Sequence, residues 1–182
     1  MEKVWISQET DYSAFELDEL FWFLKRKERT LTRENTYIMT MISRIPRQIV
    51  GYSVDKSVNA KAIQRIADST PPAKEYYTDG NLVYLDVIFD GRHRRNAFNK
   101  RDTHTIESTN ADLRHHIRGL SRRSRCFFRS SETLRAVLSV FIDAYNKFGE
   151  AKLKTRVPVK HKSTSKHLHR YRYPTFSVLD YL

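Results

Sequence analysis

The sequence predicts an α/β domain in which helices cover a mixed β-sheet. Three apolar segments follow one another near the N-terminus with short links, an order typical of an antiparallel meander. Segments of strand and helix character then alternate, which favours further strands in the same sheet with helices packed on it. With 182 residues, 40% of them hydrophobic, the chain is long and apolar enough for one sizeable core.

The first segment, residues 15–24 (FELDELFWFL), is apolar on both faces and is predicted to be a buried strand. Residues 36–45 and 48–56 are rich in β-branched and aromatic side chains and are predicted to be the second and third strands. Pro46 separates them, because proline cannot donate a hydrogen bond to a sheet ladder.

A helix is expected next, because apolar residues from Ala60 to Ala67 recur at helical spacing. Asn59 is a suitable N-cap, and the prolines of the TPPAK segment stop the helix. Residues 74–80 then read as a short strand that runs into a turn. Residues 81–89 are ambiguous between strand and helix, with helix favoured, and residues 94–102 are the candidate last strand.

Two helices are predicted in the remaining ordered part. The first spans residues 103–119, with Thr105 as N-cap and Gly119 after its last turn. The second spans residues 130–149, carries an apolar stripe and is expected to end at Gly149.

The chain is therefore divided into a lead-in over residues 1–14, a catalytic-type domain over residues 15–150 and a basic tail over residues 151–182. We expect no membrane span and no signal peptide. The single cysteine, Cys126, excludes an intrachain disulfide and a multi-cysteine zinc site, which fits a reducing cytoplasm.

The charge distribution indicates a polyanionic partner. The formal net charge is +12, but residues 1–91 hold 12 Lys and Arg against 14 Asp and Glu, while residues 92–182 hold 21 against 7. A field of this kind favours nucleic acid first and an anionic membrane face second, while solubility alone is the simpler alternative.

Three acids occupy places where α/β sheets form sites: Asp18 within the first strand, Asp79 at a strand end and Glu107 in the first turn of a helix. Asp18 is the strongest candidate, because a carboxylate inside an apolar strand is costly unless it is paired or coordinated. Asp79 also suits an ordinary turn, and Glu107 also suits a helix dipole.

Converging carboxylates repel one another, and a hard cation such as Mg²⁺ relieves that repulsion. Two such ions can activate a water or a 3′-hydroxyl and stabilise the leaving oxygen of a phosphodiester. Glu16 is expected on the same strand face as Asp18, and Glu19 on the opposite face; neither receives a role from the sequence.

Basic side chains follow Glu107 at intervals that suit phosphate binding. Asn110, Arg114 and Arg118 are predicted to share its helix face. A solvated basic face is the alternative. The next segment adds four arginines that are candidates for DNA contact: Arg122, Arg123, Arg125 and Arg129. Phe127 and Phe128 between them suit either base stacking or the core.

Three segments, ELDEL (16–20), YYTDG (76–80) and IESTNADLRHHIRGLSRRSRCFFRS (106–130), resemble the catalytic core of bacterial DDE transposases of the insertion-sequence-one family. The resemblance covers about residues 12–150. It implies a ribonuclease H-like mixed five-stranded sheet flanked by helices. It also implies Asp18, Asp79 and Glu107 as a catalytic and metal-binding triad.

The resemblance further implies Mg²⁺ or Mn²⁺ as cofactor, and element ends and target DNA as partners, with no membrane. We expect a homodimer or higher oligomer on DNA in the bacterial cytoplasm, at the nucleoid. Transposases of this kind carry an N-terminal module that reads the element ends, and residues 1–14 offer no zinc ligands for one. We therefore expect a catalytic fragment, a second reading frame normally fused by frameshifting, or a degenerate copy. Two other functions stay open: a ribonuclease H-like nuclease or resolvase, and a non-catalytic basic DNA-binding regulator from a truncated element.

Overall fold

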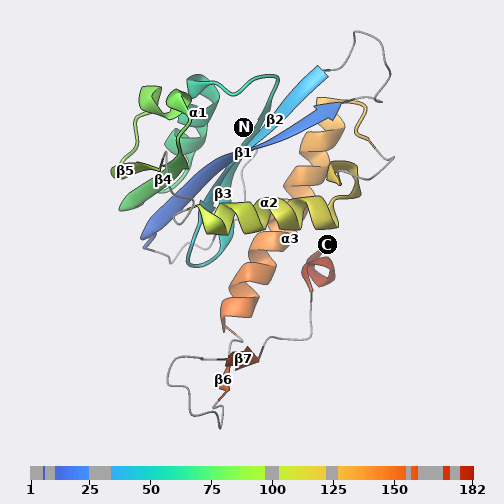
Figure 1. Cartoon of the computed structure of the whole chain (residues 1–182). Coiled ribbons are helices and arrows are strands. Elements are labelled where there is room, and N and C mark those ends of the chain that lie inside the picture. Colours follow the sequence, from blue (N-terminus) through green and yellow to red (C-terminus); the bar gives the residue numbers. More distant parts are fainter. Residues whose placement is uncertain are drawn as a thin grey trace.

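The apolar first segment forms the central strand of a five-stranded sheet (Figure 1). β1 (Ala14–Leu24) pairs antiparallel with β2 (Glu34–Ser43) and parallel with β4 (Glu75–Asp79). β3 (Gln48–Asp55) and β5 (Arg92–Asn96) are the two edge strands, so the order is β3-β2-β1-β4-β5. The predicted α/β class and mixed sheet are confirmed, and the order is consistent with a ribonuclease H-like topology.

The computed structural model describes Ile6 and residues 11–24, 34–96, 103–121, 127–154, 157–159, 170–172 and 177–182. Within these ranges, no helix is long and apolar enough to cross a membrane.

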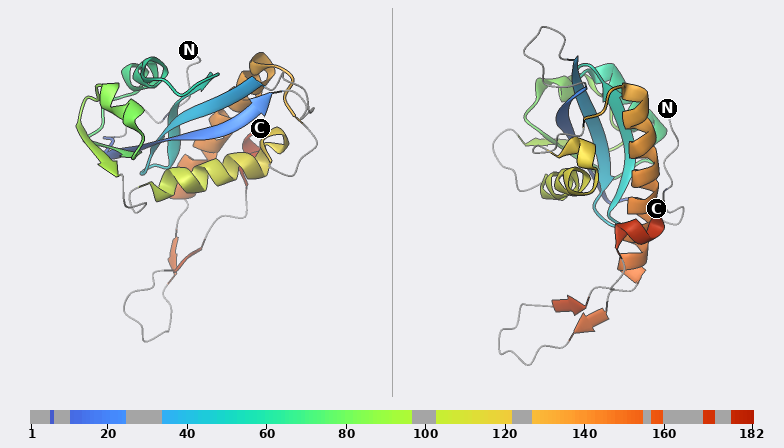
Figure 2. Two further views of the ribbon diagram at one scale, coloured as in Figure 1. Left: turned by 45° about the horizontal axis from the view of Figure 1, so that its top comes forward. Right: turned by 90° about the vertical axis from the view of Figure 1, so that its right-hand side faces the viewer.

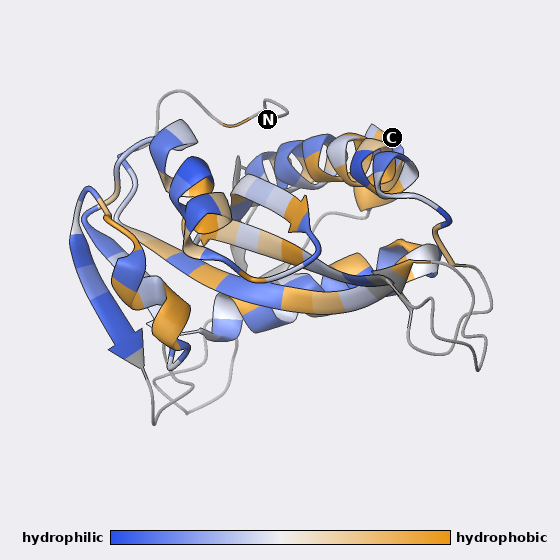
Figure 3. Cartoon of the chain, turned by 90° about the horizontal axis from the view of Figure 1, so that it is seen from above, coloured by the Kyte–Doolittle hydropathy of each residue, from blue (hydrophilic) through white to orange (hydrophobic). Residues whose placement is uncertain are grey.

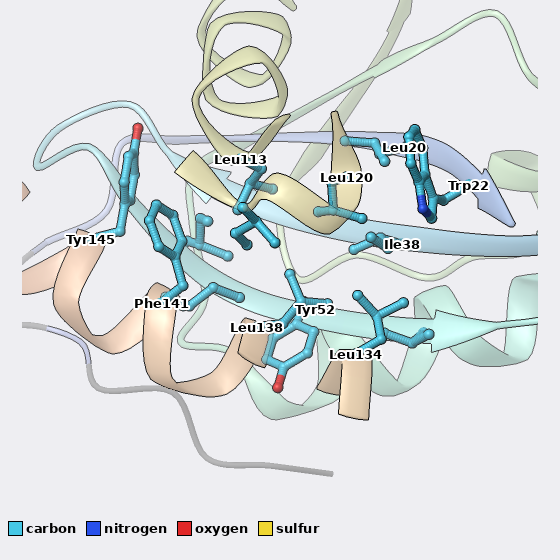
Figure 4. Close-up of a cluster of buried hydrophobic side chains, with 14 of the residues drawn as sticks. Leu20, Trp22, Ile38, Tyr52, Leu113, Leu120, Leu134, Leu138, Phe141 and Tyr145 are labelled. Atoms are coloured by element: carbon cyan, nitrogen blue, oxygen red, sulfur yellow. The ribbon is translucent and has the colours of Figure 1, made fainter. Parts of the chain in front are cut away.

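Alternate residues of β1 serve two separate cores, as expected from the period of two along a strand. Phe15 and Leu17 join a cluster with α1 (Ala60–Ser69). Leu20 and Trp22 join a second cluster with α2 (His104–His116) and α3 (Ser131–Lys154). Figure 4 shows side chains of this second cluster converging from the sheet and both helices.

The helix ends show which local signals decide them. α1 begins as predicted, with the Asn59 side chain accepting a hydrogen bond from the Ala62 N–H at 2.8 Å. The segment predicted as a helix over residues 81–89 forms only a short 3-10 helix, η1 (Leu82–Asp86). The predicted strand over 94–102 is β5, which begins two residues earlier; residues 97–102 lie outside the described residues.

The predicted N-cap of α2 was wrong, because Thr103 rather than Thr105 occupies that position. α2 ends at His116, so Gly119 lies beyond it in the 3-10 helix η3 (Arg118–Leu120). A Cβ on Gly119 would lie 2.4 Å from the Phe128 ring, so the glycine makes room for that ring rather than ending the helix.

Gly149 does not end α3, which continues to Lys154, so the boundary predicted at residue 150 falls inside this helix. A Cβ at Gly149 would lie 2.5 Å from the Arg47 carbonyl oxygen, so a glycine lets the helix approach the β2–β3 turn. Further on, β6 (Val157–Val159) and β7 (Arg170–Arg172) form a small antiparallel ladder, set apart from the five-stranded sheet in Figure 2. The 3-10 helix η4 (Val178–Tyr181) packs on α3.

Candidate metal site

β1 and β4 separate where the candidate acids lie. The two strands pair only from Ala14 to Glu16 on β1 and from Glu75 to Tyr77 on β4. Asp18 and Asp79 each come two residues after the last pair that joins β1 to β4, Glu16 with Tyr77. The fork lies at the carboxyl end of β4, and the carboxyl ends of strands are a common place for ligand sites in α/β sheets.

Three carboxylates meet at this fork. Asp18, Glu19 and Asp79 each offer an oxygen, and these oxygens all lie within 4.8 Å of one another. Neighbouring residues of a strand point to opposite faces, so Asp18 and Glu19 reach the fork from the two sides of β1. The structure therefore brings together two members of the predicted triad and adds Glu19.

Burial and neighbouring negative charges favour the protonated forms of Asp18 and Glu19. Burial raises the pKa of Asp18, and the charges of Asp79 and Glu107 raise it further. Hydrogen bonds from the backbone N–H of Glu19 and from the Asn110 amide lower this pKa in part. Burial raises the pKa of Glu19 to about 7; the neighbouring Tyr84 hydroxyl opposes this rise, and the charges of Asp79 and Asp18 add to it. A cation at the fork would stabilise all the ionised forms.

The polar atoms around the fork fit a hard divalent cation. Glu19 Oε1 and Asn110 Oδ1 are both buried and have no hydrogen-bond partner among the described residues. Carboxylate and amide oxygens are ligands that Mg²⁺ accepts, and buried oxygens without partners are uncommon. This donor set contains oxygen atoms only, as Mg²⁺ or Mn²⁺ prefers.

Glu107, the third predicted acid, lies outside this close group. It is exposed in the first turn of α2, and its charge reaches the site by raising the pKa of Asp18. Its neighbour on the next turn, Asn110, is only 5% exposed and donates a hydrogen bond from Nδ2 to Asp18 Oδ2 at 2.9 Å. Asn110 thus orients an acid, although the sequence had suggested a DNA contact.

The predicted line of phosphate-binding side chains along α2 is not formed. Asn110 is inside the site, Arg114 is half-buried, and Arg118 lies past the end of the helix in η3. The backbone leaves the α-helical path at Ile117, so the period of 3.6 residues does not extend to Arg118.

The basic segment after η3 lies only partly within the described residues. Arg129 is exposed, as a DNA-contacting residue would be, whereas Arg122, Arg123 and Arg125 lie outside the described residues. Phe127 and Phe128 are half-buried and pack against the core cluster of α2 and α3. This contact supports the core interpretation of these two rings over base stacking.

Sequence reasoning missed Glu19 and Tyr84. The signal for Glu19 was an acid beside Asp18 in an apolar strand, but strand periodicity assigned it to the other face. Tyr84 is 1% exposed in η1, and burial, with the charge of Glu19, raises its pKa well above the usual value. Nothing in the sequence distinguished this tyrosine from an ordinary core residue.

No protein-family model matches this chain, and a search of curated proteins found no significant match.

Proposed function

We propose that this chain is the ribonuclease H-like catalytic domain of a DDE transposase similar to the insertion-sequence-one family. One observation carries the proposal: three carboxylates converge at the fork of β1 and β4 in a mixed sheet of order β3-β2-β1-β4-β5. The reaction is metal-dependent hydrolysis of a phosphodiester at an insertion-sequence end, followed by strand transfer to target DNA.

In this proposal Asp18 and Asp79 hold Mg²⁺ or Mn²⁺, with Glu19 as a further ligand from the other side of β1. Glu107 approaches from α2 and completes the site, and Asn110 fixes the orientation of Asp18. When bound, the metal activates a water or 3′-hydroxyl and stabilises charge on the phosphodiester. A bound cation would stabilise the ionised forms of Asp18 and Glu19, whose pKa values burial raises.

DNA as the partner is supported by the charge of the chain and by exposed arginines on its surface. Arg118 and Arg129 are exposed, and β5 presents Arg92, Arg94 and Arg95 on the edge strand beside Asp79. Figure 3 shows β5 as hydrophilic along its length at one end of the sheet. Arg94 is paired with Glu75 at 2.6 Å, whereas Arg92 and Arg95 have no side-chain hydrogen bond or ion pair within the described part of the chain.

The proposal is tested with supercoiled plasmid and with a pre-cut duplex made from the DNA that flanks the gene. We expect Mg²⁺- or Mn²⁺-dependent nicking and joined products, and we expect Asp18→Asn to lose both while retaining DNA binding. Cleavage without joining would favour a nuclease or resolvase. Metal-independent DNA binding without any cleavage would favour a non-catalytic regulator, and cleavage that persists in Asp18→Asn would refute the site.

A further inference from the structure

We propose that Glu16 is a positioning residue, whose carboxylate fixes the start of α2 and thereby places Asn110 and Glu107 at the metal site. This inference rests on the proposed function, since it assigns a role around the same site. Both Glu16 oxygens are bonded to other groups, and Glu16 is not among the three converging acids, so we do not assign it as a ligand. Its role follows from what its two oxygens bind.

The Glu16 side chain is completely buried, yet both of its oxygens are used. Oε1 accepts a hydrogen bond from Arg44 Nε at 2.6 Å, and Oε2 accepts one from the Ile106 backbone N–H at 2.8 Å. A buried carboxylate is retained only when charge and hydrogen bonds compensate its lost hydration. These two bonds join β1 to the β2–β3 turn and to α2.

The N–H of Ile106 is one that α2 leaves free. The first four N–H groups of a helix have no partner within it, and here the N-cap residue Thr103 makes no side-chain capping bond. Ile106 is the third residue of α2, the usual recipient of a capping bond. Glu16 thus supplies from β1 the capping oxygen that the Thr103 side chain does not, and it adds to the negative charge of Glu107 at the helix start.

The spacing of the contacts holds α2 at two points. Glu16 and Asp18 lie on one face of β1, about 6.7 Å apart along the strand. Ile106 and Asn110, their partners on α2, are four residues apart, about 6 Å along the helix axis. These two spacings nearly match, so both hydrogen bonds form together. Glu107 directly follows Ile106, the residue that Glu16 binds.

Arg44 extends the same connection to the strand that carries Asp79. Its guanidinium carbon lies 4.0 Å from the centre of the Tyr77 ring, two residues before Asp79 on β4. One buried carboxylate therefore connects all three elements that supply the site: β1, β4 and α2.

The alternative is that Glu16 only stabilises the fold. Measuring metal affinity distinguishes this alternative from the positioning role. We expect Glu16→Gln, which keeps the shape but not the charge, to weaken Mn²⁺ binding on the order of tenfold or more, as replaced partners of metal-binding groups do. Binding is measured by electron paramagnetic resonance of free Mn²⁺. Asn146→Ala is the matched control, because Asn146 is also fully buried and bonds the Ile49 N–H at 2.7 Å and its carbonyl at 2.9 Å, away from the fork.

A double variant tests whether Glu16 acts through α2. If it does, adding Glu16→Gln to Asn110→Ala will weaken Mn²⁺ binding less than it does in the wild type, because the contact it supports is already lost. Should Glu16→Gln fail to fold, Arg44→Gln removes the same ion pair from the partly exposed side and is measured in the same way.

The inference is overturned if Glu16→Gln and Asn146→Ala lower stability alike while both keep the wild-type Mn²⁺ affinity. If the wild type itself binds no Mn²⁺, the proposed function fails instead. Positioning is then judged from metal-free NMR spectra. It predicts that Glu16→Gln shifts the Asn110 side-chain amide and the Glu107 backbone amide, and unchanged signals would refute it.

Discussion

Glu19→Gln should change how the stability of the metal-free protein depends on pH. Burial raises the Glu19 pKa to about 7, against an ordinary value of 4.5. A pKa that is higher in the folded state means that folding favours the protonated acid. The resulting stabilisation is complete below pH 4.5 and is lost as the pH rises through 7.

The size of the effect follows from this shift. A rise from 4.5 to about 7 corresponds to about 3.4 kcal/mol at most. Because the site is partly open to solvent, we expect about 2 kcal/mol. Glutamine cannot ionise, so the variant lacks this loss. The histidines His93 and His116, whose pKa values burial lowers, act in the opposite direction but are common to both proteins.

The assay is urea unfolding in EDTA at pH 5 and pH 8, with wild type and Glu19→Gln compared at each pH. Between these values, the wild type should lose about 2 kcal/mol relative to the variant. Added Mg²⁺ should then stabilise the wild type at pH 8 and stabilise the variant much less. An equal pH dependence in both proteins would refute the burial argument, and equal Mg²⁺ stabilisation would remove Glu19 from the site.

Three further predictions follow. Tyr84→Phe removes the hydroxyl that lowers the Glu19 pKa, so Mg²⁺ binding should be weaker at pH 7. In Mg²⁺ titrations from pH 6 to 9, the midpoint of the pH dependence of binding should move to higher pH. An unmoved midpoint would contradict the contact between Tyr84 and Glu19. Arg92→Gln with Arg95→Gln should lower the salt slope of DNA binding by about 0.7–0.9 per arginine, measured by fluorescence anisotropy, whereas Arg65→Gln on α1 should leave it unchanged; equal slopes would exclude β5 from the DNA contact. Gly149→Ala should destabilise the protein by about 1–3 kcal/mol in urea unfolding, because its Cβ would meet the Arg47 carbonyl oxygen at 2.5 Å; the exposed Val140→Ala is the control, and a stabilised Gly149→Ala would show that α3 gives way.

The strands and two acids of the candidate site, Asp18 and Asp79, could be predicted because their signals are local. The apolar run of β1 specified a buried strand, and Asp18 stood out in it because a buried carboxylate needs a partner. Glu19 could not be placed, since its access to the fork depends on where the pairing of β1 with β4 ends. That point is set by the two chain segments together.

The helical part shows the same limit. The period of 3.6 residues correctly grouped Asn110 with Glu107, but it could not show that Asn110 turns inward to Asp18. The helical period also placed Arg118 on the same face, although the helix ends before Ile117. Gly119 and Gly149 looked like helix ends. Gly119 instead makes room for Phe128 in the next segment, and Gly149 makes room for the Arg47 carbonyl, far away along the chain.

The central place of β1 also has a consequence for the order of folding. The pairing of β1 with β2 and of β2 with β3 joins nearby residues, but the bond from Glu16 to Ile106 spans 90 residues and that from Asn110 to Asp18 spans 92. Closing such long loops costs more entropy than closing a hairpin, so we expect the meander to form first and the metal site last. During synthesis, a ribosome must therefore deliver residues through α2 before Glu16 and Asp18 can reach their partners on that helix. Pulse-labelled hydrogen exchange would detect this order as early protection of β2 and β3 and late protection of α2.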